Sequence, residues 1–560
     1  MIEKFAKALS NAVVSKKLVK GAIAKEKVVL AREMGVKKIP TDIEVLLHST
    51  DEVRKILKEV LVTKPVRTGS GVTVVAIMTK PLACPHGKCT MCPGGPNSFF
   101  GSVPQSYTGN EPATMRAMRN AYDAYLQVMN RLQQYILLGQ NPEKVEMIIM
   151  GGTFPATSQR YQEEFVRDAL QAMNDFSTIC YADEFDIDKF KNVFKLPGSM
   201  HDETRAKEIR EFMLKYKADN QKSLQEVQED NDLKSRIKCI GMTIETKPDW
   251  GFAKHGNKLL ELGCTRIELG TQSPYDSVLD IVHRGHSMND TYKSTQELRD
   301  LGFKLNFHIM PGLPGVDEEK DVKGLLQWFS DSRLRPDMVK VYPCLVMPGT
   351  PLFDDYKAGK FIPLSTEEAG KRIAILKSKI PRYCRIMRIQ RDIPTKVTEA
   401  GADITNLRQY INTEMKKNKW TCNCIRCRER IPANGERRTR ITHYTASKGT
   451  EYFIEELAGD QLLGFCRLRF PSASLRAEIT KTTGIIRELH VYGRAIGILD
   501  ESNIKDRQHK GVGKKLMETA EDVSLKHEKN KMVVISGIGV RGYYRKLGYA
   551  LEGPYMVKAL

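Results

Sequence analysis

A short loop carries three closely spaced cysteines, in the order Cys84-Pro85-His86-Gly87-Lys88-Cys89-Thr90-Met91-Cys92, directly after the strand-like run Val72–Met78. Three thiolates on one loop repel each other and oxidise easily, so their spacing indicates a bound metal centre. Closed zinc and ferredoxin sites use four protein ligands. A [4Fe-4S] cluster held by only three would leave one iron open for a substrate or cofactor. The alternatives are zinc with a distant fourth ligand, or thiols without metal.

An open iron is what radical S-adenosylmethionine (SAM) enzymes need, because the amine and carboxylate of SAM chelate it. The usual spacing in these enzymes is C-x3-C-x2-C, whereas this loop has C-x4-C-x2-C. The loop therefore predicts a [4Fe-4S] cluster with Cys84, Cys89 and Cys92 as ligands and SAM as the cofactor, provided that the neighbouring motifs agree.

The composition is that of a globular protein with two or three domains: 560 residues, 41% hydrophobic and 28% charged. The sequence has no apolar run of about 18 residues, so we expect no membrane helix, and its start does not resemble a secretory signal. Twelve cysteines, two groups of them clustered, favour metal ligation in a reducing cytosol. We therefore expect a cytoplasmic protein.

The net charge of +20 suggests a polyanionic partner, with nucleic acid as the first candidate. The charge is concentrated in two segments. Residues 1–40 carry ten Lys and Arg against three acidic residues, and residues 381–440 carry fifteen against six. The alternative is a solvated charged face without a partner.

Four regions follow along the chain. Residues 1–70 predict a basic, helical segment suited to binding nucleic acid, and residues 71–345 alternate strand-like and helical runs. Such alternation predicts an α/β fold with a parallel sheet, a full or partial TIM-type barrel. Residues 346–440 are expected to be a basic connector, and residues 441–560 a separate α+β domain. Within the barrel, residues 185–235 are highly charged and suggest a mobile insertion. The expected barrel strands are Val72–Met78, Val145–Met150, Ile237–Thr243, Arg266–Gly270, Lys304–Met310 and Met338–Tyr342.

Polar and glycine residues end several of these strands, where loops build the site of a barrel. Two glycines after the second strand would let a ligand approach the backbone closely, because no Cβ is in the way. The alternative is a plain strand-to-helix turn. Carboxylates, amides and a lysine on the next strand ends could hydrogen-bond SAM. The candidate SAM-binding residues are Gly151, Gly152, Thr153, Glu245, Lys247, Glu268 and Gln272.

The C-terminal region contains Gln508-His509-Lys510-Gly511-Val512-Gly513 before an amphipathic helix. Backbone N–H groups at such a turn can bind a pyrophosphate. The pattern Q-x-x-G-x-G is similar to the CoA-binding turn of GNAT acetyltransferases. A Tyr-rich helix, Gly542–Tyr549, would place a tyrosine hydroxyl near the thioester sulfur, and the edge of Arg487–Tyr492 would pair with the pantetheine amides. The tyrosines could instead be core residues.

A second cysteine group, Cys422, Cys424 and Cys427, lies in the expected connector. A structural zinc there would stabilise a segment that has few apolar residues. Cys384 and His443 are the candidate fourth ligands. The alternative is reduced thiols without metal.

Taken in order, the motifs resemble one family over almost the whole chain: the catalytic subunit of the Elongator complex and its single-chain archaeal and bacterial relatives. The resemblance rests on Cys92–Pro96, Gln105–Gly109, Gly151–Phe154, Glu245–Asp249 and Arg388–Pro394. It implies acetyl-CoA bound by the C-terminal domain, and Tyr543 and Tyr544 as the catalytic pair. The implied acetyl-CoA contacts are Lys144, Glu488, Leu489, His490, Val491, Gln508, Gly511, Val512, Gly513 and Tyr543.

The resemblance also implies a reaction. A 5′-deoxyadenosyl radical takes hydrogen from the acetyl methyl, the carbon radical adds to C5 of the wobble uridine in the anticodon stem-loop of tRNA, and hydrolysis leaves a carboxymethyl group. An electron donor is required, and the chain would act as a homodimer or in an Elongator-like assembly. One rival interpretation is a protein lysine acetyltransferase with a structural iron–sulfur domain, and another is an RNA-binding scaffold.

Overall fold

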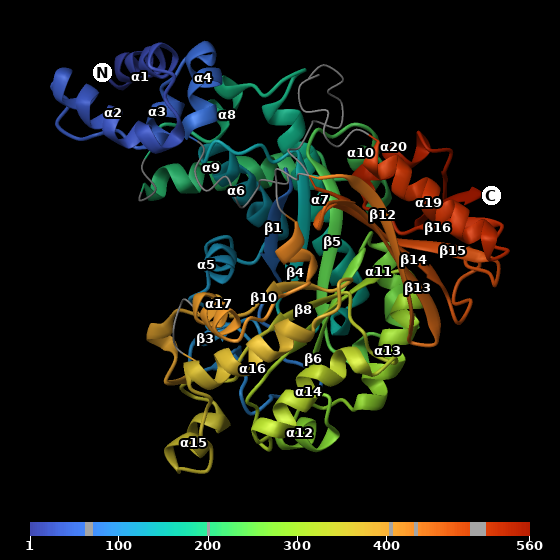
Figure 1. The fold of residues 1–560 in the computed structure, drawn as a ribbon. Coiled ribbons are helices and arrows are strands. Elements are labelled where there is room, and N and C mark those ends of the chain that lie inside the picture. The colour runs from blue at the N-terminus through green and yellow to red at the C-terminus, as the bar shows by residue number, and fades with distance from the viewer. Residues whose placement is uncertain (62–70, 199–201, 403–406, 430–434, 493–510) are drawn as a thin grey trace.

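The computed structural model describes residues 1–61, 71–198, 202–402, 407–429, 435–492 and 511–560. Its largest sheet has seven parallel strands in the order β1-β4-β5-β6-β7-β8-β10. This is an open half-barrel, as the alternation of strands and helices predicted (Figure 1). The strands are β1 (Thr73–Met78), β4 (Lys144–Met150), β5 (Lys238–Thr246), β6 (Arg266–Gln272), β7 (Lys304–Ile309), β8 (Met338–Val341) and β10 (Arg385–Arg388).

The last strand, β10, lies inside the segment expected to be a connector, so the half-barrel extends beyond residue 345. Helices cover the convex face of the sheet. The helices of this domain are α5 (Pro112–Arg119), α6 (Ala124–Leu137), α7 (Gln159–Cys180), α11 (Ala253–Glu261), α12 (Asp276–Ile281), α13 (Met288–Asp300), α14 (Glu318–Ser330), α15 (Pro351–Lys357), α16 (Thr366–Lys379), α17 (Leu407–Lys417) and α18 (Ile425–Arg428). Two small antiparallel strand pairs complete the domain: the hairpin of β2 (Gly95–Ser98) and β3 (Gly101–Val103), and the pair of β9 (Leu345–Val346) and β11 (Ala400–Gly401), which are distant in sequence.

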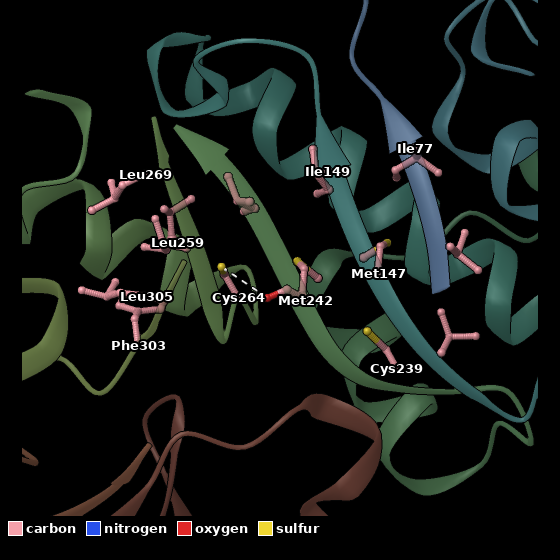
Figure 2. Close-up of a cluster of buried hydrophobic side chains, with 14 of the residues drawn as sticks. Ile77, Met147, Ile149, Cys239, Met242, Leu259, Cys264, Leu269, Phe303 and Leu305 are labelled. Atoms are coloured by element: carbon pink, nitrogen blue, oxygen red, sulfur yellow. Dashed lines mark hydrogen bonds between the residues drawn. The ribbon is translucent and has the colours of Figure 1, made fainter. Parts of the chain in front are cut away.

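The main core lies between the convex face of the sheet and the helices. Alternate residues of each strand point to it, because successive side chains of a strand face opposite sides. Figure 2 shows this layer, with Met147 and Ile149 from β4, Met242 from β5 and Leu305 from β7. The alternate residues that face the concave side are polar on several strands, and they matter for the site.

The described residues of segment 185–235, namely 185–198 and 202–235, are mostly helical and packed, in contrast to the mobile insertion expected from the sequence. They form α8 (Ile187–Val193), α9 (Glu203–Asp219) and α10 (Leu224–Leu233). Phe190 and Val227 are fully buried, and the amide of Asn231 donates a 2.9 Å hydrogen bond to the Asn174 side chain of α7. A few apolar and amide anchors therefore suffice to pack a highly charged segment.

The N-terminal helices form a small bundle with its own core, which includes Phe5, Leu9 and Leu57. The bundle lies at one edge of the molecule, beside α6 (Figure 1). Of the ten basic residues in segment 1–40, all except Lys27 are exposed. The helices are α1 (Ile2–Ser15), α2 (Lys20–Glu33), α3 (Asp42–Leu47) and α4 (Asp51–Leu61).

The C-terminal domain has a second seven-stranded sheet, in the order β12-β13-β14-β15-β16-β18-β17. Most pairs are antiparallel, but β15 and β16 are parallel, and α19 packs on one face. This mixed sheet agrees with the expected α+β domain. Its elements are β12 (Arg437–Ala446), β13 (Gly449–Ala458), β14 (Gln461–Phe470), β15 (Thr483–Val491), α19 (Val512–Lys526), β16 (Lys531–Val534), α20 (Arg541–Arg545), β17 (Ala550–Glu552) and β18 (Tyr555–Ala559).

Buried ion pairs join the two domains. Arg469 donates to Asp300 at the end of α13 at 2.6 and 2.8 Å, and Arg487 donates to Asp337 before β8 at 2.6 and 2.8 Å. All four side chains are 0% exposed. Removing one partner of such a pair costs roughly 3–5 kcal/mol, because the other charge stays buried.

Among the helices that the structure describes, none is long and apolar enough to cross a membrane.

Candidate functional site

The cysteine loop lies at the carboxyl end of β1, where the barrel predicts a site. Cys89 and Cys92 are buried, and Cys84 is half-buried. The three sulfurs face different neighbours. Cys84 lies 3.7 Å from the Thr153 hydroxyl and Cys92 lies 3.8 Å from the Ser106 hydroxyl. The structure therefore brings the loop against the turn after β4.

Cys89 is held from the other side of the loop. The guanidinium of Arg284, which is 9% exposed, donates to its sulfur at 3.6 Å, and Nε2 of His86 lies 3.2 Å from the same atom. Arg284 also donates to the carbonyl of Gly270 at the end of β6 at 2.8 and 3.3 Å. Arg284 thus ties the cysteine loop to the strand that carries two of the predicted SAM residues.

The three loop cysteines fit a cluster better than a single ion. The sulfurs of Cys84, Cys89 and Cys92 do not all lie within 4.8 Å of one another. Among the described residues, only the cysteines of the second group converge to that extent. Burial raises the pKa of Cys84 and of Cys92, so metal binding would have to favour the thiolates. Three separated sulfurs around one loop suit a multi-iron centre, which is wider than one ion.

The Gly151–Gly152 turn follows β4 with φ angles of +123° and +105°. A Cβ on Gly151 would lie 2.4 Å from the Thr79 hydroxyl, and one on Gly152 would lie 3.1 Å from the Gln105 Cβ. Glycine is therefore required here by close packing against Thr79 and Gln105 and by the backbone conformation. The sequence analysis explained the two glycines differently, by the close approach of a ligand to the backbone. The contact of this turn with SAM stays a prediction.

Glu245 and Lys247 end β5 on the same rim. Glu245 accepts a 3.1 Å hydrogen bond from the Tyr107 hydroxyl. Lys247 is 2% exposed, and its ammonium contacts Asp249 at 3.3 Å and the Gly285 carbonyl at 3.4 Å. Burial lowers the pKa of Lys247. Both residues lie at the carboxyl end of β5, and their contact with SAM stays a prediction.

Glu268 is fully buried in the concave face. It accepts hydrogen bonds from Asn306 at 3.0 Å and from Lys340, and it lies 2.8 Å from Nε2 of His308. Burial works against its ionisation, but Lys340 and His308 outweigh it and hold the pKa of Glu268 well below its usual range. Glu268 is therefore a carboxylate that organises the rim. Gln272, with φ +63°, ends the same strand, and its Oε1 has no partner among the described residues.

The glycine turn of the C-terminal domain meets a tyrosine. Gly511 begins α19 with φ +92°, a conformation that favours glycine. A Cβ on Gly513 would lie 2.7 Å from the Tyr543 hydroxyl and 3.6 Å from Val491. Gly511, Val512, Gly513, Tyr543 and Val491 thus lie together, as expected for a CoA site. Gln508 lies outside the described residues.

The edge of β15 is open where the sequence predicted pantetheine binding. Residues 483–486 of β15 pair with β16, and the 3.1 Å bond from Ile535 N to Ile486 O ends this pairing. Residues 488–491 pair with β14 on their other side only, within the described part of the chain. Their backbone can therefore accept a ligand strand. Glu488, Leu489, His490 and Val491 have this position.

The two tyrosines differ. Tyr543 is 37% exposed, and burial raises its pKa to about 12. Tyr544 is 6% exposed and packs in the core beside Tyr549, with ring centroids 6.1 Å apart. The core interpretation thus fits Tyr544, and the catalytic interpretation fits Tyr543. Lys144 begins β4 at the amino end, opposite the cysteine loop, and burial lowers its pKa.

The second cysteine group fits a single metal ion. The sulfurs of Cys422, Cys424 and Cys427 all lie within 4.8 Å of one another. Cys384 is fully buried next to this group, since its backbone carbonyl accepts a 3.0 Å bond from Ile425 N. Its sulfur is not part of the set that converges within 4.8 Å, so its role as the fourth ligand stays a prediction.

His443 is not suited as the fourth ligand. Its neighbour on β12, Tyr444, stacks on Tyr383 with ring centroids 4.1 Å apart, on the side of Cys384. His443 itself faces Tyr452 on the opposite side of the sheet, with centroids 6.1 Å apart. Alternation along a strand puts adjacent side chains on opposite faces, so this part of the prediction was wrong.

A half-barrel of parallel strands with a three-cysteine loop at its carboxyl end defines the class of radical SAM proteins. The model of the Radical SAM superfamily matches residues 82–328, and that of the Radical_SAM C-terminal domain matches residues 336–417. The second match includes β10.

Relatives are similar over nearly the full chain. A tRNA uridine(34) acetyltransferase of Methanocaldococcus infernus is 42% identical over 93% of this chain and 92% of the relative, and Elongator complex protein 3 of Homo sapiens is 36% identical over 96% and 93%. The solved structure of the M. infernus Elp3 with N-terminus deletion (1–46) has a TM-score of 0.70 at 36% identity, and covers 88% of this chain and 100% of that chain. The chain belongs to this family of tRNA uridine(34) acetyltransferases and Elongator complex protein 3.

Three side chains at the rim had no role assigned from the sequence: Arg284, Tyr107 and Arg391. Arg391 donates to the Ser106 carbonyl and lies over the Tyr107 ring, 5.8 Å from its centroid. Arg391 and Tyr107 occur in the motifs that carry the family resemblance, which was the available signal. Only the fold shows that these segments meet.

Proposed function

We propose that this chain installs a carboxymethyl group at C5 of the wobble uridine (U34) of tRNA, with SAM and acetyl-CoA as cosubstrates. The observation that supports it most is the combination, on one chain, of the three-cysteine loop at the carboxyl end of a half-barrel and the glycine turn against Tyr543 in the C-terminal domain. Relatives that match nine-tenths of the chain are named tRNA uridine(34) acetyltransferase.

In this proposal Cys84, Cys89 and Cys92 hold a [4Fe-4S] cluster. When bound, the cluster and SAM would supply a radical that can take hydrogen from the acetyl methyl. Glu245 and Lys247 orient SAM at the rim, supported by Tyr107 and Asp249 respectively.

Acetyl-CoA is held by the C-terminal domain. The N–H groups at the start of α19 bind the pyrophosphate, and the open edge of residues 488–491 binds the pantetheine amides. Tyr543 keeps its proton at neutral pH, because burial raises its pKa to about 12. Its hydroxyl can therefore donate a hydrogen bond to the thioester sulfur.

The basic N-terminal helices bind the tRNA. Their exposed Lys and Arg side chains suit phosphate contacts, which give affinity without sequence information. The modified base would come from the anticodon loop, whose single-stranded bases can be splayed out. The proposal includes an electron donor, a cytoplasmic location, a homodimer or Elongator-like assembly, and zinc at the second cysteine group.

The test uses tRNA with uridine or cytidine at the wobble position and acetyl-CoA labelled in its methyl group. Label should enter only the uridine-bearing RNA, and only with SAM and reductant present. Label on protein lysines, independent of SAM, would instead indicate a lysine acetyltransferase.

A further inference from the structure

The two candidate sites lie at opposite ends of the half-barrel. The cysteine loop and the Gly151–Gly152 turn follow strands, so they lie at the carboxyl end. The C-terminal domain packs against the amino end: a Cβ on Gly539 would lie 2.7 Å from the Lys238 Cβ at the start of β5, and Arg487 donates to the Phe303 carbonyl just before β7 at 2.7 Å. A six-residue strand is about 20 Å long. A substrate that uses both sites must cross this distance.

The concave face of the sheet carries polar side chains between the two sites. The residues that alternate with the core residues of Figure 2 point to this face. They are Lys144 and Glu146 on β4, Thr243 on β5, Arg266 and Glu268 on β6, and Lys304 and Asn306 on β7.

Arg266 presents unused donors to this face. It is 4% exposed, its Nη1 pairs with Glu146, and its Nε lies 3.8 Å from Glu268. Nε and Nη2 have no hydrogen-bond partner among the described residues. These two N–H groups lie on one edge of the guanidinium and form a fork for an oxygen acceptor. Buried donors without a partner are rare in proteins.

Two neighbouring polar atoms are also unpaired. The amide nitrogen of Asn306 donates to Glu268 at 3.0 Å, which leaves its Oδ1 without a partner among the described residues. Thr243, directly opposite Arg266 in the strand register, has an unpaired hydroxyl. Asn306 is 0% and Thr243 is 1% exposed. Three adjacent strands thus build one buried polar site.

This site adjoins the strand with the open edge. Burial works against the ionisation of Glu488, but the charges of Arg467 and Lys304 outweigh it, so its pKa is lowered. Glu488 accepts a 2.8 Å hydrogen bond from Arg467, which also donates to the carbonyls of Asp337 and Tyr383, just before β8 and β10. Glu488 of β15 therefore lies at the amino end of the half-barrel. Lys144, which the family resemblance implies at CoA, points to this same face two residues before Glu146.

We propose that this site receives the acetyl group of acetyl-CoA, with Nε and Nη2 of Arg266 donating hydrogen bonds to the thioester carbonyl oxygen. The inference rests on the proposed use of acetyl-CoA. A carbonyl oxygen has two lone pairs and can accept both bonds. The acetyl methyl would then lie inside the half-barrel, between the open edge of β15 and the cysteine loop. Free CoA has no such carbonyl, so Arg266 distinguishes acetyl-CoA from CoA.

The test compares the affinities of acetyl-CoA and CoA by isothermal titration calorimetry. The wild type should bind acetyl-CoA more tightly than CoA. Arg266→Lys keeps a cation beside Glu146 but loses the pair of N–H donors. The affinity for acetyl-CoA should therefore fall by about 10-fold, and the affinity for CoA should not change. Arg266→Gln keeps one planar donor, and an intermediate ratio is expected.

Arg385→Lys is the matched control. Arg385 is also a buried arginine near Glu488, but its guanidinium already pairs with Glu429 and donates to the Tyr492 hydroxyl at 2.9 Å. Its substitution should lower the melting temperature without changing the ratio of the two affinities. An equal loss for both ligands in Arg266→Lys, or no loss, would overturn the inference. Wild-type protein that binds neither ligand would contradict the proposed function itself.

Discussion

The two cysteine groups differ in sequence spacing, C-x4-C-x2-C for Cys84–Cys92 and C-x-C-x2-C for Cys422–Cys427, and they also differ in geometry. Cys422, Cys424 and Cys427 converge within 4.8 Å, and the pKa of Cys424 is lowered because the thiols of Cys422 and Cys427 donate to it. The sulfurs of the loop after β1 are spread, and each one contacts a different polar group. A convergent set of sulfurs can hold one ion, and a spread set can surround a cluster. The difference in spacing and the different contacts of the sulfurs therefore point to two different metal centres.

The largest expected effect comes from the spread group. Cys89→Ala removes one of three cluster ligands and also the sulfur that Arg284 contacts. We expect complete loss of the iron–sulfur absorption after anaerobic reconstitution, and no SAM cleavage. Acetyl-CoA affinity should be unchanged, because its candidate contacts lie in the C-terminal domain and on the concave face near the amino end of the half-barrel, away from the cysteine loop. If the wild-type protein binds one zinc ion in this loop and never cleaves SAM, the assignment of an iron–sulfur cluster to the loop is wrong.

The second effect concerns the convergent group. Cys424→Ser should reduce bound zinc from about one ion per chain to near zero, while the iron content stays as in the wild type. The melting temperature should fall, because zinc binding contributes to folding stability. Metal analysis of both proteins and thermal unfolding measure this. If the wild type contains no zinc, these cysteines are reduced thiols.

The fourth ligand of the convergent group separates two candidates. Cys384→Ser should weaken zinc retention against a chelator by at least about 10-fold, whereas His443→Ala should leave it unchanged, because His443 faces Tyr452 on the far side of the sheet. Zinc release followed with a colorimetric chelator gives the comparison. Equal release from both variants would point to a ligand other than Cys384.

The sequence predicted the half-barrel well, because alternating apolar residues such as Met147 and Met242 mark each strand. It missed β10, since Arg385–Arg388 is four residues long and has arginine at both ends. It also took α8–α10 for a mobile insertion, because few apolar residues anchor these helices. The candidate cofactor residues could be found from motifs. His443 could not be excluded, because the face that a side chain occupies depends on strand register.

The smallest expected effect tests how the fold separates the two groups. Arg284 holds Cys89 and the Gly270 carbonyl together, and a Cβ on Gly270 would lie 2.5 Å from the Arg284 Nη2. In Arg284→Met the loop cysteines should still bind iron, because all three sulfurs remain. A charge-assisted contact to one sulfur is lost, so we expect the cluster to be lost several-fold faster in air, and its electron paramagnetic resonance signal to shift. Arg284→Lys should restore part of the lifetime but not the bond to Gly270, since one ammonium nitrogen cannot span the two acceptors that different guanidinium nitrogens of Arg284 reach. The convergent group should keep its zinc in both variants. A cluster with wild-type lifetime and signal in Arg284→Met would mean that the spread geometry is maintained by the loop itself.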